Sequence, residues 1–459
     1  MFRVHIDRSD WEKLDSHLRQ SMPNENGAFF LFHIGMGIRD TRVIINELCL
    51  PTEESWESKG EHSLRPSGKW LSSVIGQAIE CESGIGFVHS HPNNSHPPTL
   101  STIDFETSVE WSRTFSPMLE SPFVSMVWTP NGIEGMVFTE VDLNVRTAKI
   151  GRIETSGQGS IILLSASSHK QVQEELDDRQ IRAIGALGNL KLRELSVAII
   201  GCGGTGSPLA EQVARMGVKE LTLIDPDILD SASNLRRVVG SRKGDLGLKT
   251  SKAEIVGRNI RSVGLELEVK VLPLDVRTFE ATKTIIDSDV VITTTDTHSS
   301  RSWINQIAYQ YSLPVIDVGV KVGISRSGVV SGMPADVRIL LSDTGCLWCR
   351  RVLNSDLIRA ENLPKDERIE LAAEGYIQGV LEPQASLTPL NFFASSVALL
   401  SLLRLYSSDD SAAASFIADG WEHYFAENSS AIDPLCVCSS WRRLGDGVMM
   451  TYLDSESVG

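Results

Sequence analysis

The chain has little cysteine, a deficit of positive charge and no long apolar run. Only 7 of its 459 residues are cysteine, too few for a disulfide framework at this length. Asp and Glu outnumber Lys and Arg by 59 to 43, a net charge of −16, which argues against non-specific binding to nucleic acid or anionic lipid. We find no stretch long enough to span a bilayer and no apolar signal core near the start. We therefore expect a cytoplasmic protein that binds neither membrane nor nucleic acid.

The length favours two or three domains. Residues 1–150 alternate short apolar runs with turns and predict a small α+β domain. Its expected strands cover 27–34, 41–50, 84–90 and 123–129, and the spacing of apolar residues over 10–22 predicts a helix. Residues 151–190 are expected to form a helical connector and the N-terminal arm of the next domain.

The second half alternates buried-type strands with helical stretches. Apolar runs at 195–200, 221–227, 267–276, 289–296 and 313–320 predict strands. This alternation is typical of a doubly wound, mostly parallel α/β sheet of the Rossmann type, which we place over residues 191–459. Residues 354–385 are polar and irregular and predict a crossover loop.

Two histidines and an aspartate form a candidate metal site in the first domain. His89 and His91 are two residues apart on a predicted strand, so both side chains face the same way. Asp104 opens the next predicted helix and offers an oxygen ligand. Two imidazoles, one carboxylate and an open position are typical of catalytic rather than structural zinc. A zinc-bound water also needs a general base, which a nearby Glu can supply.

The runs His89-Ser90-His91-Pro92 and Ser101-Thr102-Ile103-Asp104 resemble the JAMM (MPN-type) metalloprotease family. The resemblance implies a cytidine-deaminase-like domain that holds catalytic Zn²⁺ on His89, His91 and Asp104. The segment 23–27 resembles the part of the family that carries the catalytic glutamate, which implies Glu25 as general base. Ser101 would then stabilise the oxyanion.

Several alternatives to this zinc site stay open. The loop between His91 and Ser101 is longer than the family usually shows, and its His96 is expected to be no ligand. Glu47 and Glu82 are weaker candidates for the base. The cluster can also be a set of satisfied polar groups without metal.

A glycine loop marks a candidate nucleotide site in the second domain. Gly201, Gly203, Gly204 and Gly206 follow a predicted strand and precede a helix, where backbone amides and the helix N-terminus can approach phosphates. Asp225 ends the next strand, at the distance typical of a ribose-binding acid. A dinucleotide-binding dehydrogenase fits these features equally well.

Three further segments, 224–237, 246–254 and 293–301, resemble the ThiF/MoeB/ubiquitin-activating superfamily. That resemblance implies an enzyme that uses ATP and Mg²⁺ to adenylate the C-terminal glycine of a ubiquitin-fold protein. In that pattern Asp225 binds the ribose, and Asp227 lies close to the nucleotide. Asn234 and Arg237 contact the triphosphate, with Arg236 beside them, and Lys252 or alternatively Lys249 binds phosphate. Asp296 binds magnesium, and Arg301 supports it. Arg179 or Arg182 would reach the nucleotide of a partner subunit in a homodimer.

These residue types suit the chemistry. Attack of a carboxylate on the α-phosphate needs cations on the leaving pyrophosphate and magnesium to spread the charge, and little acid–base catalysis.

The pairs Cys346/Cys349 and Cys436/Cys438 resemble the structural zinc ligands of the same superfamily. Four unliganded thiols are the alternative. The remaining cysteines, Cys49, Cys81 and Cys202, are not placed like a catalytic cysteine in the crossover loop. The step after adenylation stays open: transfer to a nucleophile of a partner such as a conjugating-enzyme-like protein, an oxyester on Ser355, Ser386 or Thr388, or catalysis by Cys346.

Together these resemblances predict a bifunctional enzyme of a bacterial ubiquitin-like pathway. A zinc isopeptidase, similar to deubiquitinases, would trim or remove the ubiquitin-like protein, and the second domain would adenylate its exposed glycine. One alternative substrate is a sulfur carrier or a short peptide, adenylated for cofactor or peptide biosynthesis. In the other alternative, the JAMM-like half is a non-catalytic docking module.

Overall fold

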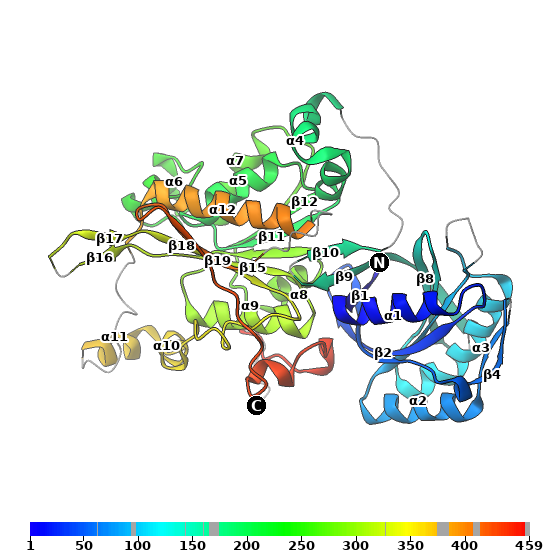
Figure 1. The fold of residues 1–459 in the computed structure, drawn as a ribbon. Coiled ribbons are helices and arrows are strands. Elements are labelled where there is room, and N and C mark those ends of the chain that lie inside the picture. Colours follow the sequence, from blue (N-terminus) through cyan, green and yellow to red (C-terminus); the bar gives the residue numbers. More distant parts are fainter. Residues whose placement is uncertain are drawn as a thin grey trace.

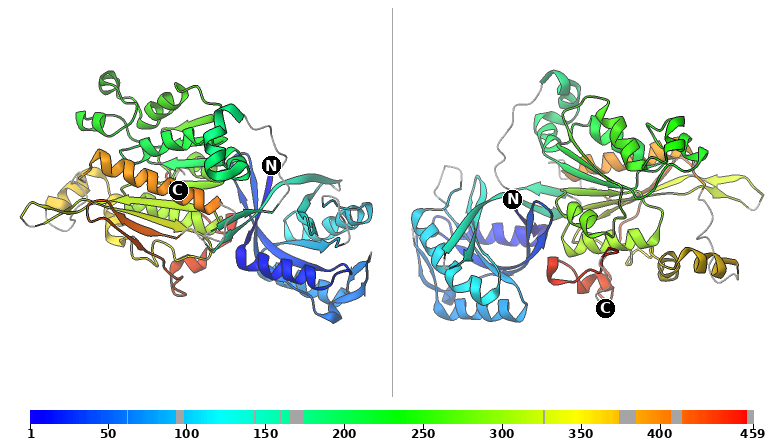
Figure 2. Two further views of the ribbon diagram at one scale, coloured as in Figure 1. Left: turned by 45° about the horizontal axis from the view of Figure 1, so that its top comes forward. Right: turned by 180° about the vertical axis from the view of Figure 1, so that it is seen from behind.

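The computed structural model describes residues 1–61, 63–92, 98–142, 144–158, 160–164, 174–325, 327–373, 385–406 and 414–454. Each half of the chain builds its own eight-stranded sheet (Figure 1). The two sheets lie beside each other, and the view from behind in Figure 2 shows the same separation.

The first sheet runs in the order β1-β3-β2-β6-β7-β8-β9-β10, and an additional parallel pairing of β1 with β9 closes it into a barrel. Its strands are β1 (Phe2–Asp7), β2 (Gly27–Met36), β3 (Thr41–Cys49), β6 (Gly84–Ser90), β7 (Phe123–Thr129), β8 (Gly132–Val141), β9 (Asn144–Gly157) and β10 (Ser160–Leu163). Helices α1 (Arg8–Gln20), α2 (Gly68–Glu80) and α3 (Thr102–Leu119) flank the barrel, and β4 (Trp56–Lys59) pairs with β5 (Leu64–Pro66).

Strand β2 is apolar almost throughout because both of its faces are covered. Phe30 and Phe32 pack in one cluster with Leu14 of α1. Phe29 and Leu31, which face the other way, pack with residues of α2 and α3. The period of two along a strand places alternate residues in separate cores.

The boundary predicted at residue 150 falls inside β9, and 151–163, predicted as helical connector, is mostly strand. The second half of β9 pairs with β1, at the other end of the domain sequence. A pairing between segments so far apart leaves no local pattern. The predicted helix is present further on, as α4 (Glu174–Arg193).

The second sheet confirms the doubly wound α/β prediction. Strands β13 (Glu268–Leu272), β12 (Glu220–Ile224), β11 (Ser196–Ile200), β14 (Val290–Thr293) and β15 (Val315–Val320) are parallel in that order. The antiparallel strands β18 (Pro334–Leu340), β19 (Phe416–Asp419) and β20 (Tyr424–Glu427) complete the sheet.

Helices cover both faces of this sheet (Figures 1 and 2). One core contains residues of α5 (Gly206–Arg215), α7 (Lys252–Arg261) and α12 (Thr388–Tyr406), and α6 (Lys243–Leu248) precedes α7. The other core contains residues of α8 (Phe279–Ile286) and α9 (His298–Gln310). Val197 and Ile199 of β11 belong to the first core, and Ala198 and Ile200 to the second.

The segment predicted as an irregular crossover loop contains two helices, α10 (Ser355–Glu361) and α11 (Lys365–Ala373). Asn354 caps α10, because its side chain accepts hydrogen bonds from the backbone N–H groups of Asp356 and Leu357. The smaller elements are the hairpin β16 (Gly323–Ile324) and β17 (Val330–Gly332), and the short 3₁₀ turns η1 (Glu53–Ser55), η2 (Ala232–Arg236), η3 (Val437–Ser440) and η4 (Gly445–Gly447).

Within the described ranges, α12 alone has the length and composition to cross a membrane, although we predicted no such stretch. It has 19 residues, and a window of 18 of them has a mean hydropathy of 1.3. Ala398, Leu402 and Leu405 are fully buried in the core shared with α5 and the sheet. This burial explains the apolar sequence as that of a core helix.

A buried ionic network joins the barrel to the second sheet. The Asp289 carboxylate contacts Arg3 at 2.6 Å and Arg152 at 3.1 Å, and its side chain is 1% exposed. Arg42 donates from Nε to the carbonyl oxygen of Ile286 at 2.8 Å. Burial raises the pKa of Asp289, but the charges of Arg152 and Arg3 outweigh it and hold the pKa below its usual value.

The C-terminal segment bridges the same two bodies. Arg443 contacts Asp7 at 3.2 Å and Asp10 at 2.9 Å. The Asp446 carboxylate accepts the backbone N–H of Met36 at 2.7 Å and the Lys283 ammonium at 2.8 Å. Barrel and sheet are therefore held from two directions.

Candidate functional site

His89, His91 and Asp104 come together in the structure. His89 is the second-last residue of β6, and Asp104 lies in the first turn of α3. The Nε2 atom of His89 lies 3.2 Å from that of His91 and 3.2 Å from Asp104 Oδ1. The three ligand atoms all lie within 4.8 Å of one another. This donor set of two imidazole nitrogens and a carboxylate suits zinc with an open coordination position.

The cap of α3 fixes Asp104 against the histidines. Its carboxylate accepts the Ser101 backbone N–H at 2.8 Å, and Ser101 Oγ accepts the Asp104 N–H at 3.2 Å. Burial raises the pKa of Asp104, but hydrogen bonds from His89 and His91 outweigh it and hold the pKa well below its ordinary value. The hydrogen bond with Asp104 raises the pKa of His91. The carboxylate and the two imidazoles are therefore close enough to stabilise one another electrostatically.

Glu25 is the glutamate that the structure places beside these ligands. Its Oε1 lies 4.0 Å from His91 Nε2, and its backbone N–H donates to the carbonyl oxygen of Gly60 at 2.9 Å. Glu25 comes just before β2, where Gly27 pairs with His89. Glu47 and Glu82 are exposed elsewhere, beside Cys49 and His33 respectively. His96 lies outside the described residues.

The glycine loop lies between β11 and α5. Gly201 has a φ of +92°, and a Cβ at Gly206 would collide with the Gly201 carbonyl oxygen. A Cβ at Gly203 would meet open space, so the backbone there is accessible. At Gly204 a Cβ would lie 2.5 Å from Nδ2 of Asn391. Only glycine allows this loop to stay close to both the sheet and α12.

Two carboxylates and a lysine meet next to this loop. Asp225 accepts the backbone N–H groups of Cys202 at 2.6 Å and Asp227 at 2.8 Å, and burial raises its pKa. Lys252 Nζ lies 2.6 Å from Asp227 Oδ2. Burial lowers the pKa of Lys252, but the bond to Asp227 and the charges of Asp225 and Asp296 raise it overall. The cluster places a permanent cation beside the glycine loop.

Lys249 is placed differently from Lys252. It is exposed and has a left-handed φ of 51° at the end of α6. Lys252 begins α7 and is the lysine that contacts Asp227, close to the predicted ribose-binding Asp225.

Arg237 and Asn234 form a pair close to Gly204 of the loop. Arg237 Nη2 donates to Asn234 Oδ1 at 2.7 Å, and the Arg237 Cβ lies 3.5 Å from where a Cβ of Gly204 would be. Arg236 is exposed. Arg179 and Arg182 are exposed on α4, and Arg182 pairs with Asp178 of its own helix at 3.0 Å. Their contact with a partner's nucleotide stays a prediction.

A cavity of about 560 Å³ adjoins the loop. Asp296 and Arg301 line it, together with Thr205, Thr294 and residues of β15 and β18. Arg338 contacts Asp317 at 2.7 Å and also pairs with Asp336, and Arg301 lies 3.4 Å from Asp317. The two arginines are thus paired with two aspartates, so their charges balance. Asp296, which also lines the cavity, is an exposed carboxylate.

Sequence reasoning missed Asn391, Asp317 and Arg338. Asn391 lies on α12, and its side chain reaches Gly204 and accepts from Thr205 Oγ1 at 3.4 Å. A buried amide within an otherwise apolar helix is the signal that points to it. Asp317 and Arg338 lie inside apolar strands, and charged residues at such positions also indicate buried pairs.

The four cysteines of the two pairs come together. Cys346 Sγ lies 3.7 Å from Cys349 and 3.6 Å from Cys436, and Cys349 lies 3.8 Å from Cys438. Burial raises the pKa of Cys346 to about 11 and also raises that of Cys438. Burial raises the pKa of Cys349 too, but N–H groups of Asp433 and Cys346 outweigh it and lower it overall. Four thiols within 4.8 Å suit a structural zinc ion.

The remaining nucleophile candidates lie in varied surroundings. Cys202 is fully buried, and burial raises its pKa. Burial raises the pKa of Cys49 to about 12, and Cys81 is exposed. Ser386 Oγ accepts from Asn391 Nδ2 at 3.1 Å, Thr388 Oγ1 donates to the Arg236 carbonyl oxygen at 3.1 Å, and Ser355 begins α10. None of these residues lines the cavity over the described ranges.

Comparisons with solved structures find E. coli MccB bound to ATP, with a TM-score of 0.45 and 20% identity over 59% of this chain and 75% of that one. Among known sequences, the SAMP-activating enzyme E1 of Haloferax volcanii is 31% identical over 168 residues, which are 36% of this chain and 57% of that protein. The sulfur carrier protein ThiS adenylyltransferase of Bacillus subtilis is 29% identical over 133 residues, 29% of this chain and 39% of that protein. The match thus spans little more than half of the first relative and less of the second. The ThiF family profile matches residues 177–429, more than half of the sequence, and the chain therefore belongs to the ThiF family.

Proposed function

We propose that this chain adenylates the C-terminal carboxylate of a ubiquitin-like or sulfur-carrier protein. The observation that supports this most directly is the meeting of Lys252, Asp225 and Asp227 beside an open glycine backbone. Two relatives of similar sequence are a SAMP-activating enzyme E1 and a sulfur carrier protein ThiS adenylyltransferase.

Each group has a task in that reaction. Asp225 would accept the ribose hydroxyls, and the loop amides would approach the phosphates. Lys252 and Arg237 would stabilise the charge that grows on pyrophosphate as the carboxylate attacks. Asp296, exposed at the cavity, would hold Mg²⁺, which spreads charge on the α-phosphate. The cavity would receive the extended tail that ends at the reacting carboxylate.

ATP–pyrophosphate exchange with purified ubiquitin-fold proteins ending in Gly-Gly tests this proposal. Lys252→Ala is expected to lower exchange about 100-fold, the size typical of a lost charge-stabilising group. Lys249→Ala, three residues away and exposed, is the matched control and should leave exchange unchanged. Exchange supported by a short peptide and by no ubiquitin-fold protein would overturn the proposed substrate class.

We also propose that the barrel is a JAMM-type zinc peptidase that acts on the same tail. The support is the convergence of His89, His91 and Asp104 with Glu25 beside them. Zinc, when bound, supplies an activated water and polarises the scissile carbonyl. Glu25 would take the proton of the attacking water and return it to the leaving amine, and Ser101 would donate to the oxyanion. A barrel that holds no zinc and cleaves no tail extension would leave only a docking role.

We further propose that the acyl-adenylate passes to a nucleophile on another protein. The support is that the seven cysteines lie outside the lining of the cavity. A homodimer, in which α4 of one subunit faces the nucleotide of the other, belongs to the same proposal.

A further inference from the structure

Helix α1 supports the rim of the barrel from the side opposite α2 and α3. Asp15 Oδ1 accepts the indole N–H of Trp128 at 3.0 Å. Arg19 donates to the other oxygen of Asp15 at 2.7 Å, and its guanidinium lies 4.8 Å from the centre of the Trp128 ring. Trp128 is 1% exposed and lies near the end of β7. The indole is therefore locked between a carboxylate and a cation.

Trp128 in turn holds His91. Its backbone carbonyl oxygen accepts the His91 N–H at 2.8 Å, and Ser90 and Trp128 are register partners in β6 and β7. His91 lies just beyond the end of β6, where the regular ladder stops. The bond to Trp128 is thus the backbone contact that fixes this ligand next to Asp104.

The same helix also reaches the segment that carries Glu25. His17 Nε2 lies 3.1 Å from the Gly27 carbonyl oxygen, and Asn26 Nδ2 donates to the His17 carbonyl oxygen at 2.8 Å. The Asn26 N–H donates to Ser90 Oγ at 2.9 Å, and Ser90 N–H returns a bond to the Asn26 carbonyl oxygen. One helix therefore contacts both strand ends on which Glu25 and His91 depend.

We propose that Asp15 and Trp128 are positioning residues for the His89, His91 and Asp104 cluster. The Asp15–Trp128 bond fixes the end of β7, and the Trp128 carbonyl then fixes the backbone of His91. This inference rests on the proposed zinc peptidase function. It assigns Asp15, a half-buried residue of α1 that is far from the ligands in sequence, to the support of a metal site.

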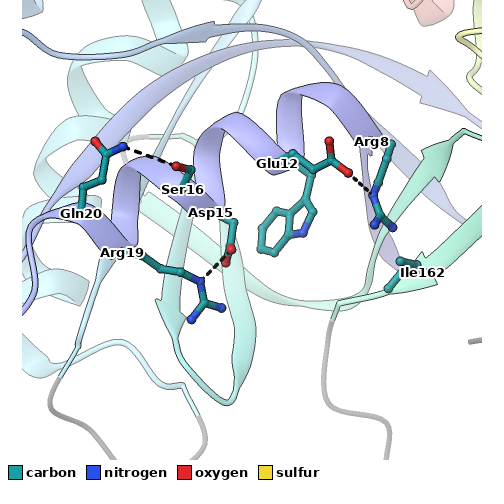
Figure 3. A pocket seen from close by; sticks show the side chains of 8 residues that line it. Arg8, Glu12, Asp15, Ser16, Arg19, Gln20 and Ile162 are labelled. Atoms are coloured by element: carbon teal, nitrogen blue, oxygen red, sulfur yellow. Dashed lines mark hydrogen bonds and ion pairs between the residues drawn. The ribbon is translucent and has the colours of Figure 1, made fainter. Parts of the chain in front are cut away.

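Figure 3 shows the control that the chain itself offers. A surface groove of about 520 Å³ is lined by two ion pairs of α1, Asp15–Arg19 and Glu12–Arg8. Both pairs join residues four apart, at 2.7 Å and 2.8 Å. Within the described residues only Asp15 carries the additional bond to Trp128. Removal of Glu12 or of Asp15 therefore breaks one surface ion pair. Only removal of Asp15 also breaks the hydrogen bond to the Trp128 indole.

The test is zinc retention by the full-length protein against a graded series of chelator concentrations. The zinc equivalent that is lost in His89→Ala defines the barrel site. Asp15→Ala and Trp128→Phe are each expected to weaken that site about tenfold, as loss of an outer support does elsewhere. Asp15→Asn, whose amide oxygen still accepts the indole N–H, should stay within about threefold of the unmodified protein. Glu12→Ala should match the unmodified protein, and Asp15→Ala with Trp128→Phe should lose no more than either alone.

Thermal unfolding of each variant separates lost support from lost folding. Equal retention by Asp15→Ala and Glu12→Ala would overturn the inference while the zinc site stands. Asp15→Asn as weak as Asp15→Ala would also overturn it, because the indole bond would not be the cause. If His89→Ala loses no zinc, the proposed peptidase fails, and the inference fails with it.

Discussion

The histidine–aspartate cluster of the barrel and the cysteine cluster of the ThiF domain differ in the number of their ligands and in how far these are buried. His91 and Asp104 keep 17% and 20% of their side chains exposed, and a glutamate lies beside them. Cys346 and Cys438 have no exposed surface, and four sulfurs leave no position for water. An accessible site with three ligands suits catalysis, whereas a closed site with four suits a structural link. The comparison sets the proposed catalytic zinc site apart from the proposed structural zinc site.

The largest difference should appear in His89→Ala. Cleavage of a carrier extended beyond Gly-Gly is expected to fall at least about 10³-fold, because loss of zinc removes several kcal/mol of transition-state stabilisation. The thermal midpoint should move by less than about 2 °C, because the strands around the site keep their packing. A large fall in the midpoint would make this cluster structural as well and would break the comparison.

Cys346→Ala should show the opposite pattern. The protein is expected to lose one zinc equivalent and about 10 °C of thermal stability, since the sulfurs connect segments 90 residues apart. Amide exchange at Met36 should accelerate, because Asp446, which accepts that N–H, follows closely after Cys438. Cys81→Ala, at an exposed position, is the control. Unchanged zinc content would identify the four cysteines as unliganded thiols.

Asp289→Asn tests whether the two clusters belong to one body. Loss of this buried charge leaves Arg3 and Arg152 without their shared partner and should cost about 3 kcal/mol in urea unfolding at pH 7. Because the folded pKa of Asp289 is below its ordinary value of 3.8, its contribution is complete above that value. It is lost as the pH falls from there through the folded-state pKa. The variant should lack this part of the acid dependence.

The matched control for Asp289 is Asp178→Asn. Asp178 pairs with Arg182, but their side chains are 53% and 76% exposed, so the stability should stay unchanged. If Asp289→Asn behaves like this control, the barrel and the ThiF domain are independent.

The smallest expected effect is kinetic. A mild chelator should remove zinc from the barrel several-fold faster than from the cysteines, because His91 and Asp104 are partly exposed whereas Cys346 and Cys438 are fully buried. Time-resolved zinc release, with His89→Ala to assign the fast phase, measures this order. Release from the cysteines first would reverse the comparison.

The parallel sheet could be predicted from the sequence because its strands are short apolar runs between helices, and each of these segments can be recognised from its own residues. It did not predict the closure of the barrel, because β1 and β9 carry no mark of each other. The crossover helices were missed because α10 and α11 are polar, and capping by Asn354 determines where α10 begins.

The same distinction holds for the sites. His89, His91, Asp104 and the four cysteines occur in short motifs, so their convergence could be predicted. The choice between Lys249 and Lys252 needed the course of the turn, in which Lys249 ends α6 and Lys252 begins α7. Asn391 reaches the glycine loop from 187 residues further along the chain than Gly204, and only packing of α12 shows it.

The contacts of the C-terminal segment with the barrel can form only after nearly all of the sequence has been translated. The bond between Met36 and Asp446 spans 410 positions, so the barrel leaves the ribosome long before the residues that hold it. Arg3 and Arg42 emerge first, while Asp289, Arg443 and Asp446 are still to be synthesised. The barrel segment is therefore synthesised before Asp289, which pairs with the Arg3 and Arg152 guanidinium groups, and before Asp446.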